Sequence, residues 1–201
     1  MSPTTDSVAL FGAFVFYFAA AFVWPTLRVW RRTGVNPYVL PSTDDAYGFV
    51  TAGMRAVIVG LFVYVFLQMG RPDLEPALGA LPWLAHRAVA IAGWAGLALA
   101  TIWTVVAQYQ MGRSWRIGID TKHKTDLVTT GLFAWSRNPI FLAMRVSMFS
   151  LVLLRPNAAT LALWLVGDVL IQFQVRLEEA FLAERHGAAY ATYRSRVRRW
   201  I

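Results

Sequence analysis

The sequence contains no cysteine and only three histidines. The lack of cysteine excludes disulfides, cysteine-ligated zinc, iron–sulfur clusters and thiol catalysis. The histidines are widely separated, at His86, His123 and His186, so we expect no metal site. Charged residues are scarce as well, at 15% of 201 residues, whereas soluble domains carry about 25%. With 57% hydrophobic residues and a mean hydropathy of +0.48, the composition predicts a membrane protein and excludes a disordered chain.

Long apolar stretches predict five helices that span the bilayer, each of which needs ~20 mostly apolar residues. We place them at residues 7–27, 50–69, 88–107, 139–154 and 157–175. The last two are separated only by a turn at Arg155-Pro156-Asn157 and therefore form a helical hairpin. The first has no basic segment before it, so we interpret it as a permanent span and not as a signal peptide. The predicted fold class is an all-α integral membrane protein.

The basic residues predict the orientation of the chain in the membrane. They gather after the first span (Arg28, Arg31 and Arg32), in residues 110–138, and in the tail after residue 175. Five spans place these three regions on one side, which the positive-inside rule assigns to the cytoplasm. We expect a bacterial inner-membrane protein with its N-terminus outside and its C-terminus in the cytoplasm. This topology and contact with anionic membrane lipids explain the net charge of +8 without nucleic-acid binding.

The C-terminal tail has the pattern of an amphipathic helix. Tyr190, Tyr193, Val197 and Trp200 recur every three or four residues, with arginines between them. The pattern predicts a cytoplasmic helix that lies on the membrane surface as an anchor.

Ionisable residues inside spans are costly and often functional. Arg145 and Asp168 lie at similar distances from the hairpin turn, so they form either a structural ion pair or the polar lining of a cavity. Arg55 lies near the cytoplasmic end of its span, where it either has a function or extends its charged group to the interface.

Two polar groups lie at the cytoplasmic side of the hairpin. The first contains Arg176, Glu178 and Glu179, in which two adjacent carboxylates suit a cationic ligand, although a solvated Arg176–Glu179 pair is the simpler interpretation. The second runs from Leu127 to Pro139. Its Asn138-Pro139 pair is typical of a helix start, which presents free backbone N–H groups.

The two groups together resemble the isoprenylcysteine carboxyl methyltransferase family, an integral membrane superfamily that also includes phospholipid methyltransferases. The resemblance covers about residues 108–201, and its matching segments are Leu127 to Gly131, Arg137-Asn138-Pro139-Ile140-Phe141, Glu178-Glu179-Ala180-Phe181-Leu182, His186-Gly187, Tyr190-Ala191-Thr192-Tyr193 and Arg196-Val197-Arg198-Arg199. Asn138 stands where the family usually has His, and Phe141 where it usually has Tyr. Asn138 is therefore expected to orient a reactant and not to act as a base.

The resemblance implies S-adenosylmethionine as cofactor and a lipophilic or lipid substrate that enters from the bilayer. The implied reaction is carboxyl O-methylation or a related N- or S-methylation. The implied catalytic residues are Arg176, Glu179 and Asn138, and the implied cofactor-binding residues are Thr130, Gly131, Arg137, Asn138, Pro139, Phe141, Glu178, Glu179 and Tyr190.

Residues 1–107 would then form a three-span membrane region, and residues 108–201 the cofactor-binding core of a single structural domain. Two alternatives remain. One is an NADPH-dependent membrane reductase with a related C-terminal core, and the other is a non-enzymatic membrane transport or assembly protein.

Overall fold

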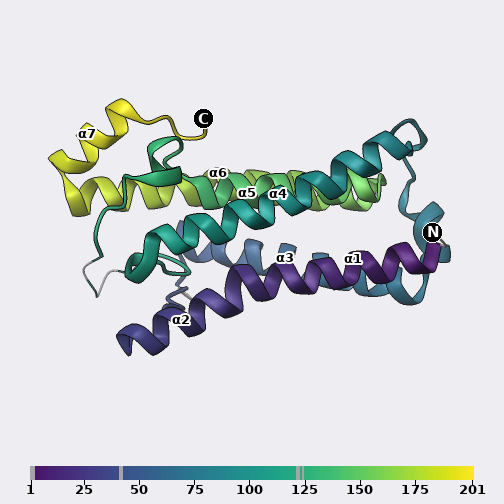
Figure 1. Cartoon of the computed structure of the whole chain (residues 1–201), viewed down its shortest axis with the longest axis horizontal. Coiled ribbons are helices and arrows are strands. Elements are labelled where there is room, and N and C mark those ends of the chain that lie inside the picture. Colours follow the sequence, from purple (N-terminus) through teal and green to yellow (C-terminus); the bar gives the residue numbers. More distant parts are fainter. Residues whose placement is uncertain (1–2, 41–42, 121–122, 124) are drawn as a thin grey trace.

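The computed structural model describes residues 3–40, 43–120, 123 and 125–201. The chain passes five times along the long axis of the molecule, so that the N-terminus and α7 lie at opposite ends (Figure 1). The passes and the final helix are α1 (Pro3–Phe18) with the π-helical turn η1 (Ala19–Val23) and α2 (Trp24–Thr33), α3 (Ala46–Gly70), α4 (Arg87–Met111), α5 (Pro139–Leu154), α6 (Ala158–His186) and α7 (Ala188–Arg196). The described residues contain no strand beyond two isolated bridges.

Helix length and composition confirm the predicted membrane fold. Among the described residues, four helical segments are long and apolar enough to cross a bilayer: Asp6–Thr33, Ala46–Gly70, Arg87–Ser114 and Ala158–His186. The remaining pass, α5, is the fourth along the chain. It is a shorter apolar helix of 16 residues with the predicted bounds. Helix α4 runs across the predicted boundary between residues 107 and 108, and that division stays a prediction.

The turn of the α5–α6 hairpin is held by Asn157, which is fully buried. Its Oδ1 accepts a hydrogen bond of 3.0 Å from the backbone N–H of Thr160, which caps α6. Its Nδ2 donates to the hydroxyl of Tyr64 on α3 at 2.8 Å. One side chain thus fixes both the start of α6 and its position against α3.

Arg145 and Asp168 form the structural ion pair that was one of the two interpretations of these residues. The pair joins α5 to α6, and the Trp200 ring lies over the Arg145 guanidinium at 4.5 Å. The C-terminal tail therefore folds back onto the hairpin.

The expected surface helix in the tail differs from the structure in two respects. Helix α7 ends at Arg196, and Val197 is extended. Tyr190 and Tyr193 are buried against the protein and not turned outward to a membrane surface. The physical reason is that Arg137 competes for the backbone: its N–H donates to the carbonyl of Arg198 at 3.0 Å, and its Nη1 donates to that of Val197 at 2.8 Å.

Candidate functional site

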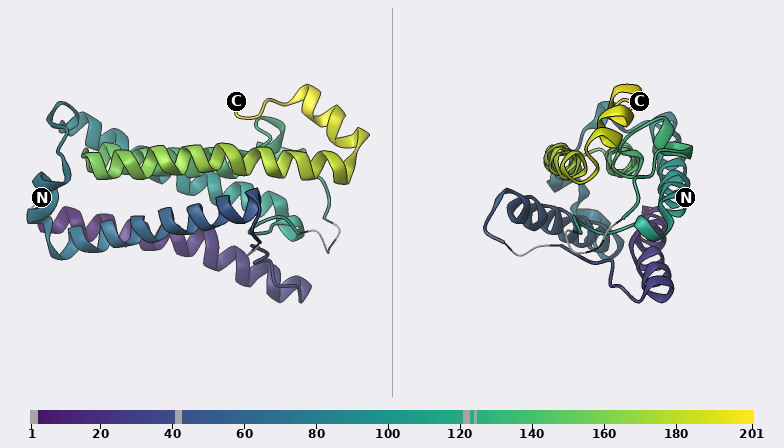
Figure 2. Two further views of the ribbon diagram at one scale, coloured as in Figure 1. Left: turned by 180° about the vertical axis from the view of Figure 1, so that it is seen from behind. Right: turned by 90° about the vertical axis from the view of Figure 1, so that its left-hand side faces the viewer.

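Most of the predicted site residues lie at one end of the bundle, where α3 and α5 begin and α4 and α6 end; we call this the site end. The described residues of the segments 34–45 and 112–138 also lie there, together with α2 and α7 (Figure 2). The two loops are joined by a backbone bridge in which Val39 N–H donates to Ile117 and Ile117 N–H donates to Pro37, both at 2.9 Å. Residues far apart in sequence thereby enclose a common region.

Gly131 allows the 112–138 segment to pack against the end of α4. Its φ is +64°, a left-handed conformation that favours glycine. The Gln110 side chain lies directly beside it and accepts a hydrogen bond of 2.8 Å from the N–H of Leu132. Gly131 therefore has a backbone role, and its neighbour Thr130 is exposed.

We expect Gly131→Ala to lower the free energy of unfolding by about 1–2 kcal/mol, because an L residue is strained in the left-handed region. The added Cβ would also lie 2.5 Å from Gln110 side-chain atoms. Unfolding in detergent measures the effect. Gly12→Ala in α1 is the control, because nothing lies within 4 Å of its Cβ position and its φ is ordinary. Equal stability of the two variants would contradict the role of Gly131.

Glu179 is the centre of a buried hydrogen-bond network. Its carboxylate accepts from Arg137 at 3.1 Å, from Asn138 Nδ2 at 3.0 Å and from Arg199 at 2.8 Å. The hydrogen bond to Glu179 raises the pKa of Arg199. Glu179 belongs to α6, Arg137 and Asn138 directly precede α5, and Arg199 belongs to the tail. Both oxygens of Glu179 already accept hydrogen bonds from charged donors. Glu179 therefore has a structural role: together with Asn138 it links α6 to the start of α5 and to the tail.

The network of Arg137, Glu179 and Arg199 has one more positive than negative charge. Arg137 is only 9% exposed, so this excess charge is held close to the protein interior. Tyr193 stands next to the network: burial raises its pKa to about 12, and its hydroxyl donates to the carbonyl of Phe133 at 2.6 Å. The network thus carries an excess positive charge, which would favour a nearby anionic group.

Glu178 has a different environment from its neighbour. Its carboxylate accepts a hydrogen bond from Gln174 Nε2 at 3.2 Å, and within the described part of the chain it has no ion pair. It lies in the wall between two cavities and lines both. Of the two adjacent glutamates, Glu178 is therefore the one available to a ligand.

The first of these cavities, which we call the polar cavity, encloses about 730 Å³ between the 112–138 segment, α6 and α7. Its lining includes carboxylates, an arginine and aromatic rings: Asp120, Asp126, Glu178, Arg137, Phe133, Phe181 and Tyr193. Asp120 is buried and accepts hydrogen bonds from Arg116 Nε and from the His123 ring, both at 3.0 Å. This mixture of charge and aromatic surface suits a ligand that carries a base, hydroxyls and charged groups.

The second, which we call the middle cavity, encloses about 900 Å³ among α1, α3, α4, α5 and α6. It shares Met111, Arg116, Gly118 and Glu178 with the polar cavity. Its lining mixes apolar side chains such as Phe141 with the polar residues Thr51, Arg55, Thr104, Gln108, Gln174 and Glu178.

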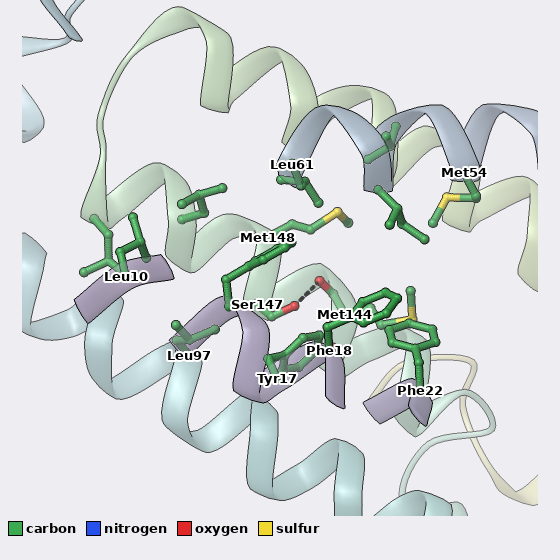
Figure 3. A pocket seen from close by; sticks show the side chains of 15 residues that line it. Leu10, Tyr17, Phe18, Phe22, Met54, Leu61, Leu97, Met144, Ser147 and Met148 are labelled. Carbon is green, nitrogen blue, oxygen red and sulfur yellow. Dashed lines mark hydrogen bonds between the residues drawn. The ribbon is translucent and has the colours of Figure 1, made fainter. Parts of the chain in front are cut away.

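The third, which we call the apolar cavity, continues the middle cavity away from the site end. The two share Tyr17, Phe22, Met54, Ile58 and Met144. Its other lining residues are hydrophobic apart from Ser147, whose hydroxyl is occupied by a hydrogen bond of 2.9 Å to the carbonyl of Met144 (Figure 3). The three cavities thus run from a charged end to an apolar end.

The structure brings most, but not all, of the predicted site residues together. Arg137, Asn138, Glu178, Glu179 and Phe141 line the cavities or the network beside them. Five others do not line the three cavities. Thr130 is exposed and Gly131 has the backbone role described above; Arg176 is exposed and donates to the carbonyl of Gln172 at 2.6 Å, Pro139 is a buried first residue of α5, and Tyr190 is buried beside Tyr193.

Several cavity residues were missed by sequence reasoning. Thr51 and Thr104 are single polar residues in apolar helices, and Asp120 lies in a segment without a motif. Their spacing held a signal: Thr51 and Arg55, like Thr104 and Gln108, are four residues apart and so share a helix face.

The fold and these cavities define an integral membrane protein whose helical bundle holds three connected cavities that start at the site end. The sequence model of the phospholipid methyltransferase family matches residues 88–189, which is half of the chain. The chain belongs to this family of membrane methyltransferases, which confirms the resemblance.

A protein-S-isoprenylcysteine O-methyltransferase of Saccharomyces cerevisiae (strain ATCC 204508 / S288c) is 32% identical to this chain over 97 residues. The match covers 46% of this chain and 40% of the yeast protein. No solved structure shows a significant match.

Proposed function

We propose that the protein transfers a methyl group from S-adenosylmethionine to the carboxylate of a lipophilic acceptor, at the cytoplasmic face of the membrane. The observation that carries this proposal is the position of Glu178 in the wall shared by the polar and middle cavities. A methyl donor in the polar cavity and a methyl acceptor in the middle cavity would therefore lie next to each other at Glu178.

The residues of the polar cavity fit S-adenosylmethionine, which carries an ammonium, a carboxylate, ribose hydroxyls and an adenine ring. Glu178 and Asp120 suit the ammonium and the hydroxyls, and the positive network at Arg137 suits the carboxylate. The rings of Phe133 and Tyr193 suit the adenine and the sulfonium. In this assignment Glu179 positions Arg137 and Asn138. The catalytic role of Arg176 stays a prediction.

Bound S-adenosylmethionine supplies an electrophilic methyl group on a positively charged sulfur. An acceptor carboxylate oxygen forms the new O–C bond while the C–S bond breaks and its electron pair stays on sulfur. No proton is transferred, so the protein needs no general base. Its task is to hold the reacting atoms ~3–3.5 Å apart and in line.

The middle and apolar cavities support an acceptor with a polar head and a long apolar tail. A tail in the apolar cavity would contact side chains of α1, α3, α4 and α5. The polar groups of this lining are Ser147 and the hydroxyl of Tyr17, which has no hydrogen-bond partner among the described residues. Such an acceptor enters from the bilayer. The cytoplasmic placement is supported by α2, α7 and the 112–138 segment, which carry most of the basic residues and lie together at the site end.

Calorimetric titration of the purified protein in lipid nanodiscs with S-adenosylhomocysteine tests the donor. We expect saturable binding and no heat with NADPH. Binding of NADPH alone would favour the reductase alternative, and binding of neither by folded protein would overturn the proposal. Transfer of a labelled methyl group to membrane lipids identifies the bond, because methyl esters release the label in base whereas N-methyl groups retain it.

A further inference from the structure

We propose that Arg55 and Thr51 of α3 hold the anionic head of the acceptor in the middle cavity, and that the acceptor is a long-chain carboxylate and not an amine. This inference rests on the proposed function and deepens it. Both residues lie outside the region that matches the family, so it concerns a property of this chain.

Arg55 is a charged residue inside an apolar helix. It lies nine residues after Ala46, the first residue of α3, and thus about 14 Å along the helix from the site end. Arg55 lines the middle cavity but is itself exposed, and it has no hydrogen bond or ion pair to any described residue. An arginine at this depth is costly unless an anion or polar partner stabilises it.

Four buried polar atoms of residues that line the same cavity lack hydrogen-bond partners among the described residues: the Tyr17 hydroxyl, Thr51 Oγ1, Thr104 Oγ1 and Gln108 Oε1. Thr51 Oγ1 and Gln108 Oε1 have no hydrogen-bond partner among the described residues, although each residue is only 3% exposed. Buried polar groups without partners are rare in proteins, and each costs about 1–3 kcal/mol. Thr51 lies one turn from Arg55 on the same face of α3. A carboxylate head group in the middle cavity would accept a hydrogen bond from the Thr51 hydroxyl, whereas Gln108 Oε1 is itself an acceptor and would need a donor.

The charges around the cavity favour an anionic head over a cationic one. Three charged residues line it, and Arg116 is already paired with Asp120 at 3.0 Å. Glu178 faces the polar cavity too, where the positive charges of the methyl donor would balance it. Arg55 is then the charge left without a counterion, and a carboxylate supplies one.

The same face of α3 leads toward the apolar cavity. Thr51, Met54, Arg55 and Ile58 follow the spacing of one helix face, and Met54 and Ile58 line both the middle and the apolar cavity. An acceptor whose head contacts Arg55 can therefore place its tail in the apolar cavity, with its carboxylate on the Glu178 side.

Photolabelling in nanodiscs tests this, with diazirine-bearing hexadecanoate and the hexadecylamine of the same length as probes. We expect the carboxylate probe to label peptides of α1, α3 and α5 that line the apolar cavity, and unlabelled hexadecanoate to compete at least tenfold better than the amine. Arg55→Gln should weaken this labelling about ten- to hundredfold, whereas Arg55→Lys should retain part of it. Arg32→Gln, an exposed arginine of α2, is the matched control and should have no effect.

Titration with S-adenosylhomocysteine separates this inference from the proposed function. Arg55→Gln should bind it within twofold of the wild type and melt at the same temperature. Loss of that binding in the variant would make Arg55 a counterion of Glu178 and overturn the inference, as would equal labelling by the two probes. Arg55-dependent labelling of a wild-type protein that binds no S-adenosylhomocysteine would support the carboxylate site and overturn the proposed function.

Discussion

Replacing Glu178 by Gln is expected to lower the affinity for S-adenosylhomocysteine at least tenfold and methyl transfer about a hundredfold, with little change in stability. The variant keeps the size of the side chain and an oxygen that can accept from Gln174, which lies 3.2 Å away. It removes the negative charge from the wall between the polar and middle cavities. A hydrogen bond to a charged group contributes about 1.5–3 kcal/mol, which corresponds to these factors.

Calorimetry and transfer of labelled methyl groups measure the two effects of Glu178→Gln. Glu184→Gln is the matched control, because Glu184 lies on the same helix but is exposed and lines none of the three cavities. Both variants should have the same melting temperature as the wild type. An unchanged affinity for S-adenosylhomocysteine in Glu178→Gln would show that this carboxylate does not bind the donor.

Glu179→Gln is expected to have its main effect on stability, with a loss of ~3 kcal/mol in the free energy of unfolding. The substitution leaves the Arg137 and Arg199 guanidiniums beside each other without the carboxylate that joins them. Removing one partner from a buried charge network is strongly destabilising because the remaining charge stays buried and unpaired. The tail, held by Arg199, should also become more accessible to proteases.

Chemical unfolding in detergent and limited proteolysis after residue 196 check this expectation. The double variant Glu179→Gln with Arg199→Gln provides a thermodynamic cycle: if the charges interact directly, the double variant should be more stable than the sum of the single effects predicts. A Glu179→Gln protein that is as stable as the wild type but has lost donor binding would contradict the structural role of Glu179. It would instead support the predicted catalytic role.

The two adjacent glutamates show where sequence reasoning stops. Residues next to each other on a helix point about 100° apart, so the sequence shows that Glu178 and Glu179 face different neighbours. Which neighbours these are depends on the rotation of α6 in the bundle and on segments 20 to 42 residues away. Only the packed structure places Arg137, Asn138 and Arg199 around Glu179 and leaves Glu178 to the cavities.

Arg55 shows the same limit. Its place in an apolar helix marks it as unusual, but its charged group could reach either the interface or a cavity. The choice depends on which face of α3 packs against α1 and α6, and α3 is apolar on nearly every side. The tail is a different case. Its regular pattern of tyrosines and arginines predicts a surface helix, but in the structure Arg137 donates hydrogen bonds to the carbonyl groups of Arg194 and Val197.

The sequence by itself determined the membrane class, the five passes, the helical hairpin and the family resemblance. These properties depend on apolar length, on local turn chemistry and on short-range spacing, all of which can be read along the chain. The tertiary structure alone decided which glutamate faces a ligand, how the tail closes the network and how three cavities join. These depend on contacts between distant segments and on helix rotation, which a nearly uniform apolar surface does not encode.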